Sequence, residues 1–161
     1  MKREKVYIET SIISYLCARP SRDLIVSANQ ELTLEWWDNK RSQYDCYISE
    51  FVMDEISAGD PDAAAKRIQS ADGIPFLLVN EVVGDLQVQI IQGLNLPKSI
   101  ATDAAHIAIA VVHSMDYLLT LNCTHIANPY WQHKLRGIIT AQGFEMPEMC
   151  TPRGLLEGEM L

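Results

Sequence analysis

The chain has 161 residues, of which 48% are apolar and 21% are charged, and this composition is typical of one folded domain and excludes a disordered protein. The 21 acidic side chains outnumber the 13 Lys and Arg side chains, and the formal net charge of −8 argues against a protein that coats nucleic acid through a broadly basic surface. No apolar run reaches the length that spans a bilayer. The sequence therefore predicts a single domain over residues 1–161 with no membrane segment.

Short apolar strands alternate with helical patterns along the chain. Ser21 is a favoured N-cap residue, and we expect it to start a long helix because apolar side chains recur at helical spacing after it. In chain order, the sequence predicts a strand at 6–8, helices at 12–17 and 22–43, a strand at 46–48, helices at 50–56 and 61–73, a strand at 76–79, helices at 81–94 and 99–114, a strand at 117–121, and helices at 129–143 and from 152.

This alternation predicts an α/β fold in which helices flank a mainly parallel central sheet. Binding and catalytic sites in such sheets form at the carboxyl ends of the strands, just before the helices that follow. Candidate functional residues are therefore sought at those strand ends.

Four oxygen-bearing side chains are predicted to converge on this edge of the sheet. Glu9 follows the first strand and Asn122 follows the fourth, while Glu55 and Asp103 lie on helices beside the second and fourth strands. Carboxylate and amide oxygens are the ligands that Mg²⁺ and Mn²⁺ prefer. The pattern predicts a divalent metal site.

Each of these residues has a structural alternative. Glu9 and Glu55 fit exposed surface acids, and Asn122 fits an ordinary turn residue. Asp103 fits a helix-start acid that interacts favourably with the helix dipole. The shared position of the four side chains carries the metal hypothesis, and no single residue does.

Four segments resemble the motifs of a known family. They are VYIETS at residues 6–11, ISEFVMDEI at residues 48–56, TDAAHIA at residues 102–108 and YLLTLN at residues 117–122. In this order they resemble the four motifs of PIN-domain proteins, and the third and fourth together are the most specific. Over residues 5–128 the chain is most similar to the VapC-like toxins of bacterial toxin–antitoxin pairs.

The resemblance implies a PIN-like three-layer sandwich and a metal-dependent endoribonuclease that hydrolyses RNA phosphodiester bonds. It implies Mg²⁺ or Mn²⁺ as the cofactor, inhibition by a small antitoxin protein, and a homodimer. Carried over position by position, the catalytic, metal-binding residues of the family fall on Glu9, Glu55, Asp103 and Asn122.

Two of these positions depart from the common family pattern. Glu9 stands where Asp is usual, and Asn122 stands where Asp is frequent. The four groups therefore carry three negative charges rather than four. We expect weaker metal affinity, with one firmly held ion.

Further polar residues flank these motifs. Thr10, Ser11 and Thr120 are expected to orient the ligands or water, or else to form ordinary strand-end hydrogen bonds. Arg19 and Arg22 are candidates for contacts to RNA phosphates, with a solvated pair at a helix start as the alternative.

The histidines and tryptophans are interpreted as structural. His106 lies three residues after Asp103 and is read as a packed polar group rather than as the residue that orients Asp103. His125 lies too close to Cys123 to form a zinc site with it, and the four cysteines form no C-x-x-C pair and are typical of reduced thiols in the cytoplasm. Trp131 and the pair Trp36–Trp37 are read as core or dimer contacts.

Three functions compete at this point. The first is the ribonuclease toxin, and the second is a catalytically weak or inactive module of the same fold that binds nucleic acid or protein. The third, a phosphatase, is disfavoured because the first strand lacks a D-x-D phrase, and nucleotide binding is disfavoured because neither glycine-rich phosphate loop occurs.

Overall fold

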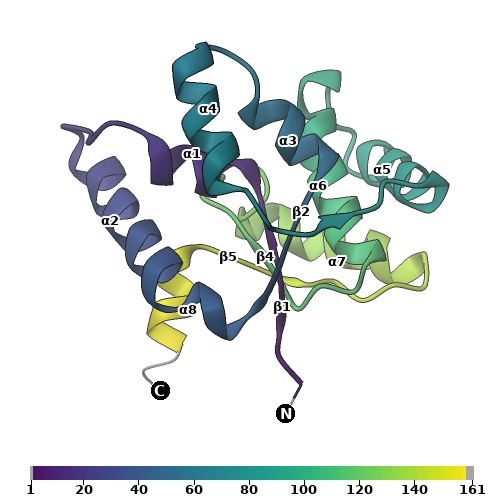
Figure 1. Ribbon diagram of the computed structural model, residues 1–161. Coiled ribbons are helices and arrows are strands. Elements are labelled where there is room, and N and C mark those ends of the chain that lie inside the picture. The colour runs from purple at the N-terminus through teal and green to yellow at the C-terminus, as the bar shows by residue number, and fades with distance from the viewer. Residues whose placement is uncertain (1, 159–161) are drawn as a thin grey trace.

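A five-stranded, wholly parallel sheet forms the centre of the molecule (Figure 1). The computed structural model describes residues 2–158. The strands are β1 (Lys5–Ile8), β2 (Asp45–Ser49), β3 (Phe76–Leu77), β4 (Tyr117–Leu119) and β5 (Glu148–Cys150). This architecture confirms the predicted α/β class, and it is consistent with a PIN-like three-layer sandwich.

The strand order across the sheet is β3-β2-β1-β4-β5. From β1 the chain first winds outward through β2 to β3, and it then returns to the other side of β1 to form β4. The order therefore reverses between β1 and β4, and in open parallel sheets ligands bind at such a switch point, outside the carboxyl ends of the strands. The residues that follow β1 and β4 lie at this point.

Two layers of helices cover the sheet. Right-handed crossovers place the connections of the outward and the return path on opposite faces. Helices α1, α3 and α4 pack together, as do α2 and α8, whereas α5 contacts α6 and α7 on the other side (Figure 1). The helices are α1 (Thr10–Cys17), α2 (Leu24–Asn39), α3 (Glu50–Ile56), α4 (Pro61–Ser70), α5 (Glu81–Gly93), α6 (Ala101–Val112), α7 (Pro129–Ala141) and α8 (Pro152–Gly158), with short 3₁₀ turns η1 (Arg41–Gln43) and η2 (Lys98–Ile100).

The core is built around β1 and α6. Val6, Tyr7 and Ile8 are fully buried because helices cover both faces of the sheet, as expected of a central parallel strand. Every residue of α6 from Ala104 to Val111 is buried, including one histidine. Within residues 2–158, no helix combines the length and the apolar content needed to cross a bilayer.

The long second helix is shorter than predicted. It ends at Asn39, and residues 41–43 form the separate turn η1. Its N-cap is Asp23, whose carboxylate accepts the Val26 backbone N–H at 3.0 Å. Ser21 was the wrong choice of cap, because its hydroxyl instead accepts the Asp23 backbone N–H at 3.1 Å and so lies one step outside the helix.

The sequence pattern did not predict β5. This strand has three residues, and only its central residue, Met149, is buried. It extends the sheet beyond β4 and accepts a hydrogen bond at its end, where the Thr120 N–H donates to the Cys150 carbonyl at 2.9 Å. β4 and β3 are also shorter than predicted, ending at Leu119 and Leu77.

Candidate active site

Glu9 joins β1 to α1 at the switch point of the sheet. Its backbone is extended and occupies the N-cap position of α1, and its N–H donates to the Leu119 carbonyl of β4 at 3.1 Å. The side chain is 5% exposed. Hydroxyls of Ser11 and Thr120 both donate to its Oε1 atom, the Thr120 bond at 2.6 Å. A buried carboxylate needs such donors, and these fix the direction in which Glu9 points.

Glu55 reaches the same edge from α3. Ser49 caps this helix, as predicted, and its hydroxyl accepts the Val52 N–H. The Oε1 atom of Glu55 accepts a hydrogen bond from Thr10 at 2.7 Å and lies 2.5 Å from His106 Nε2. Partial burial raises the pKa of Glu55, but the hydrogen bond and charge of His106, with the bond from Thr10, outweigh burial and leave the pKa below its ordinary value. Glu55 is therefore a carboxylate at neutral pH.

His106 is a buried link between Glu55 and the core. Its Nδ1 atom lies 2.7 Å from the Tyr7 hydroxyl, which is also 2.7 Å from the Ser49 hydroxyl. Burial raises the pKa of Tyr7 well above its ordinary value, so the phenol keeps its proton. Because the Glu55 carboxylate only accepts, Nε2 of His106 carries a proton and donates to it, and Nδ1 faces the Tyr7 hydroxyl. The prediction that His106 is a packed polar group is confirmed.

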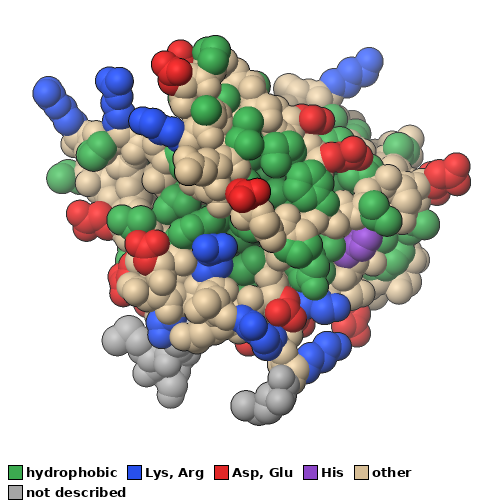
Figure 2. All heavy atoms as spheres, viewed as in Figure 1, with side chains coloured by type: hydrophobic (Ala, Val, Ile, Leu, Met, Phe, Trp, Pro, Cys, Tyr) green, Lys and Arg blue, Asp and Glu red, His purple; other side chains and the backbone are tan. Residues whose placement is uncertain are grey.

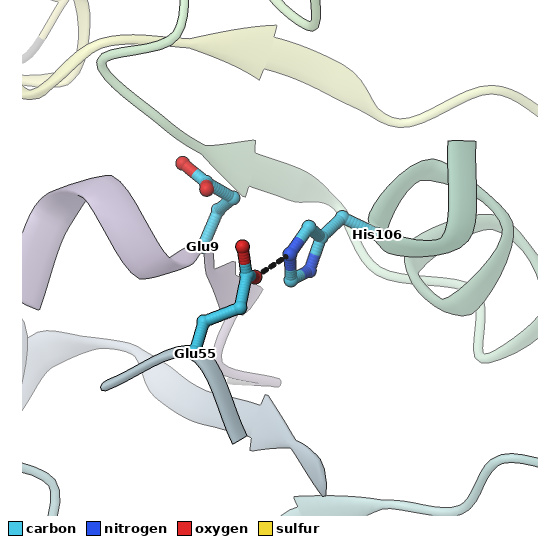
Figure 3. Close-up of side chains that lie close together, drawn as sticks. All are labelled: Glu9, Glu55 and His106. Carbon is cyan, nitrogen blue, oxygen red and sulfur yellow. Dashed lines mark hydrogen bonds and ion pairs between the residues drawn. The ribbon is translucent and has the colours of Figure 1, made fainter. Parts of the chain in front are cut away.

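Glu9, Glu55 and His106 form a group that could hold a metal ion. One ligand atom from each lies within 4.8 Å of the other two, and Figure 3 shows the three side chains converging from β1, α3 and α6. Among residues 2–158, every hydrogen bond to the two carboxylates goes to Oε1, which leaves Oε2 of each for a cation. Both His106 nitrogens have protein partners, so the two glutamates are the better ligands.

Asp103 and Asn122 form a second group beside the first. Asn122 Nδ2 donates to Asp103 Oδ1 at 3.1 Å. His125 Nδ1 donates to Asp103 Oδ2 at 2.7 Å. Asp103 lies in the first turn of α6, as predicted, but it does not belong to the glutamate and histidine group described above.

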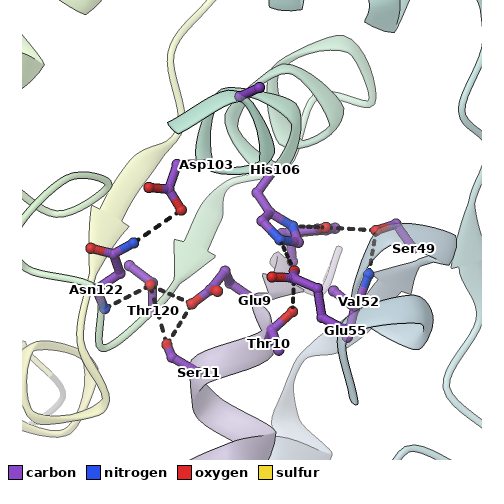
Figure 4. A network of polar contacts seen from close by, with 12 residues as sticks. Glu9, Thr10, Ser11, Ser49, Val52, Glu55, Asp103, His106, Thr120 and Asn122 are labelled. Carbon is purple, nitrogen blue, oxygen red and sulfur yellow. Dashed lines mark hydrogen bonds and ion pairs between the residues drawn. The ribbon is translucent and has the colours of Figure 1, made fainter. Parts of the chain in front are cut away.

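Thr120 connects the two groups. Its hydroxyl donates to Glu9 and accepts the Asn122 N–H at 3.0 Å, and it lies 3.4 Å from the Ser11 hydroxyl. Figure 4 shows Asp103 and Asn122 on one side of Glu9, with Glu55 and His106 on the other. The structure thus places all four predicted motif residues at the carboxyl edge: hydrogen bonds through Thr120 join Glu9 to Asn122 and Asp103, and Glu55 lies close to Glu9 with bonds of its own. Thr10 donates a hydrogen bond to Glu55, and Ser11 and Thr120 donate to Glu9; that they orient metal ligands stays a prediction.

Arg19 and Arg22 lie outside this network. Both follow α1, whose eight residues extend over about 12 Å, so the two arginines lie one helix length from Glu9. Both are exposed. Figure 2 shows basic side chains gathered at the upper left, above the region of α1, α2 and α4 in the matching ribbon view.

Three residues of the network were missed or misassigned from sequence. Tyr7 was read only as a strand residue, and no sequence signal marks its hydroxyl. From the sequence, His125 is considered only as a zinc ligand, although Asn122 three residues earlier is a residue that commonly caps a turn by accepting this backbone N–H. Trp131 is half-buried rather than in the core and stacks on His125 with ring centroids 5.1 Å apart, and its alternative role as a dimer contact stays a prediction. Trp36 and Trp37 do belong to the core, as predicted.

We compared the chain with protein-family models, with curated proteins and with solved structures. No family model, curated protein or solved structure matches it.

Proposed function

We propose that this protein is a metal-dependent endoribonuclease of the PIN type that hydrolyses RNA phosphodiester bonds. The observation that carries the proposal is the pair Glu9 and Glu55, each with one carboxylate oxygen held by protein donors and the other without a hydrogen bond from residues 2–158. Two such oxygens suit a hard cation, and we assign Mg²⁺ or Mn²⁺ to this site. A bound ion of this kind polarises a phosphoryl oxygen and lowers the pKa of a bound water.

The residues of the site divide the remaining work. Thr120 and Thr10 hold Glu9 and Glu55 in place, and His106 fixes the orientation of Glu55 through its Nε2–H. Asp103 supplies a third carboxylate beside them, held by Asn122 and His125. The chain thus keeps its negative charges apart with hydroxyl and imidazole donors, which limits their mutual repulsion before a cation binds.

The proposed substrate and partners follow from the same resemblance. An RNA chain that reaches from the site along α1 would meet Arg19 and Arg22, which suit contacts to phosphates. We also propose a small antitoxin as the inhibitor, a homodimer as the working form, and a cytoplasmic location, which the four free cysteines favour. An apolar surface on α2 supports a protein partner, because Leu24 and Ile25 are 87% and 76% exposed.

One observation favours a second function. Both oxygens of Asp103 already have protein donors, and one donor is the amide that stands in place of a fourth carboxylate. A site closed in this way suits a catalytically weak or inactive module that still binds nucleic acid or protein. Metal affinity separates the two proposals.

The test combines Mn²⁺ binding with RNA cleavage. Calorimetry on Glu55→Gln should show Mn²⁺ affinity reduced about tenfold or more, since a charged ligand is lost, and cleavage of a mixed RNA pool should fall with it. Glu50→Gln removes an exposed carboxylate from the same helix and serves as the control. A wild-type protein that neither binds Mn²⁺ nor cuts RNA would support the inactive module instead.

A further inference from the structure

The loop after β4 is closed by two asparagines. Asn122 Oδ1 accepts the His125 backbone N–H at 3.0 Å, and the Asn122 carbonyl accepts the Ala127 N–H at 2.9 Å. At the other end, Asn128 caps α7 by accepting the Tyr130 N–H, and its amide donates to the Thr124 carbonyl at 2.8 Å. Since both ends are fixed, the loop holds the His125 side chain in one place.

Asp103 receives one donor on each carboxylate oxygen, and both donors come from this loop. Asn122 Nδ2 reaches Oδ1, and His125 Nδ1 reaches Oδ2. The Asp103 and His125 side chains are only 21% and 31% exposed. Hydrogen bonds to a partly shielded carboxylate are stronger than surface contacts and determine the plane of the group.

The Asn122 side chain can satisfy both of its partners in only one orientation. Its oxygen must face the His125 backbone N–H, and its nitrogen must face Asp103. An aspartate at this position would still accept the backbone bond, but it would place a second carboxylate against Asp103. The amide is therefore required by the contacts that the residue makes.

The indole ring of Trp131 stacks on the imidazole ring of His125. The His125 and Trp131 rings are nearly parallel, with an interplanar angle of 12° and a centroid separation of 5.1 Å. Trp131 belongs to the first turn of α7, directly after the Asn128 cap. A stacked aromatic ring restricts rotation of the imidazole, so Nδ1 stays directed at Asp103.

We propose that Asn122 and His125, supported by Trp131, are positioning residues that hold Asp103 in the orientation used at the active site. This role rests on the proposed nuclease function, and it assigns Asn122 to Asp103 rather than to the metal. On this view residue 122 is Asn, where the family often has Asp, because its amide must donate a hydrogen bond to Asp103. Removal of a group that holds a metal-site carboxylate in this way commonly lowers metal affinity or activity by about 10- to 100-fold.

Two substitutions separate the hydrogen bond from the ring stack. His125→Phe keeps a ring against Trp131 but removes the donor, whereas His125→Asn removes the ring but keeps an amide donor near the position of Nδ1. We expect His125→Phe to weaken Mn²⁺ binding about tenfold or more, and His125→Asn to restore most of that loss. His133→Phe is the matched control, because His133 is an exposed histidine on α7.

A second measurement tests the contact without metal or RNA. In the metal-free protein, ¹⁵N spectra of the imidazole should show the His125 proton on Nδ1, and Asp103→Ala should abolish that preference. The proposal is overturned if His125→Phe folds and binds Mn²⁺ within twofold of wild type, or if the ring proton resides on Nε2. If the wild-type protein binds no Mn²⁺, the nuclease proposal fails, whereas the spectrum still decides whether His125 holds Asp103.

Discussion

Substitution of Asn122 by aspartate tests how the acidic network is balanced. The change removes the amide donor 3.1 Å from Asp103 and puts a second carboxylate in its place. A hydrogen bond to a charged group contributes about 1.5–3 kcal/mol. Two like charges roughly 3 Å apart repel by about 5 kcal/mol at an effective dielectric constant near 20.

The net cost is smaller than the lost hydrogen bond and the charge repulsion added together, because the new side chain can rotate away and solvent reaches Asp103, which is 21% exposed. We therefore expect the free energy of unfolding of the metal-free protein at pH 7 to fall by about 2–4 kcal/mol, a large part of the 5–15 kcal/mol typical of a domain. The assay is urea unfolding in EDTA followed by tryptophan fluorescence. Mn²⁺ should restore part of the loss, because a cation between the carboxylates relieves their repulsion.

The double variant Asp103→Asn with Asn122→Asp is the sharpest control. It exchanges the two groups, so residue 103 donates to residue 122 and still accepts from His125. We expect it to recover most of the stability lost in Asn122→Asp. Asn80→Asp, at the exposed N-cap of α5, keeps the helix cap and should change stability little. Equal stability of wild type and Asn122→Asp, or additive losses in the double variant, would refute the reasoning.

Three further predictions concern the polar core, acid stability and a helix cap. Tyr7→Phe removes the only hydrogen-bond partner of His106 Nδ1 among residues 2–158 and should lower the free energy of unfolding by about 1–3 kcal/mol, whereas Tyr130→Phe on the exposed face of α7 should leave it unchanged. Because folding lowers the pKa of Glu55, its carboxylate stabilises the fold above the ordinary glutamate pKa, and this contribution is lost as the pH falls through the lowered value. Glu55→Gln should therefore flatten the acid side of the stability curve measured in EDTA, and an unchanged slope would contradict the assigned shift. Asp23→Ala should lower the free energy of unfolding measured in urea by about 1 kcal/mol, and Ser21→Ala should lower it much less. A larger loss in Ser21→Ala than in Asp23→Ala would identify Ser21 as the N-cap instead.

The sequence predicts the strands around β1 well because their side chains are buried on both faces. Apolar runs such as residues 6–8 can be recognised without any knowledge of their partners. By contrast, β5 has one buried residue, Met149, and exists because β4 offers it an edge. Ser21 and Asp23 are equally good caps by residue type, and only the path of the chain after α1 decides between them.

The sequence predicts the positions of those site residues that directly follow a strand. Glu9 and Asn122 could be placed at one edge because the carboxyl ends of parallel strands meet there. The contact between His125 and Asp103 joins a loop to a helix 22 residues away, and no local pattern reports it. His106 gave a partial signal, since a histidine within the buried stretch of α6 requires a polar partner, but the sequence could not identify Glu55 and Tyr7 as those partners.

Cleavage of an end-labelled mixed RNA pool by the purified protein tests the nuclease proposal most directly. The assay contains Mn²⁺ or Mg²⁺, with EDTA and the nearly isosteric Asp103→Asn variant as negative controls and Asp54→Asn, an exposed acid beside Glu55, as the matched control. We predict cleavage by the wild type and by Asp54→Asn, and its loss with EDTA and in Asp103→Asn. Cleavage by Asp103→Asn at the wild-type rate, or cleavage that persists in EDTA, would contradict the proposed site.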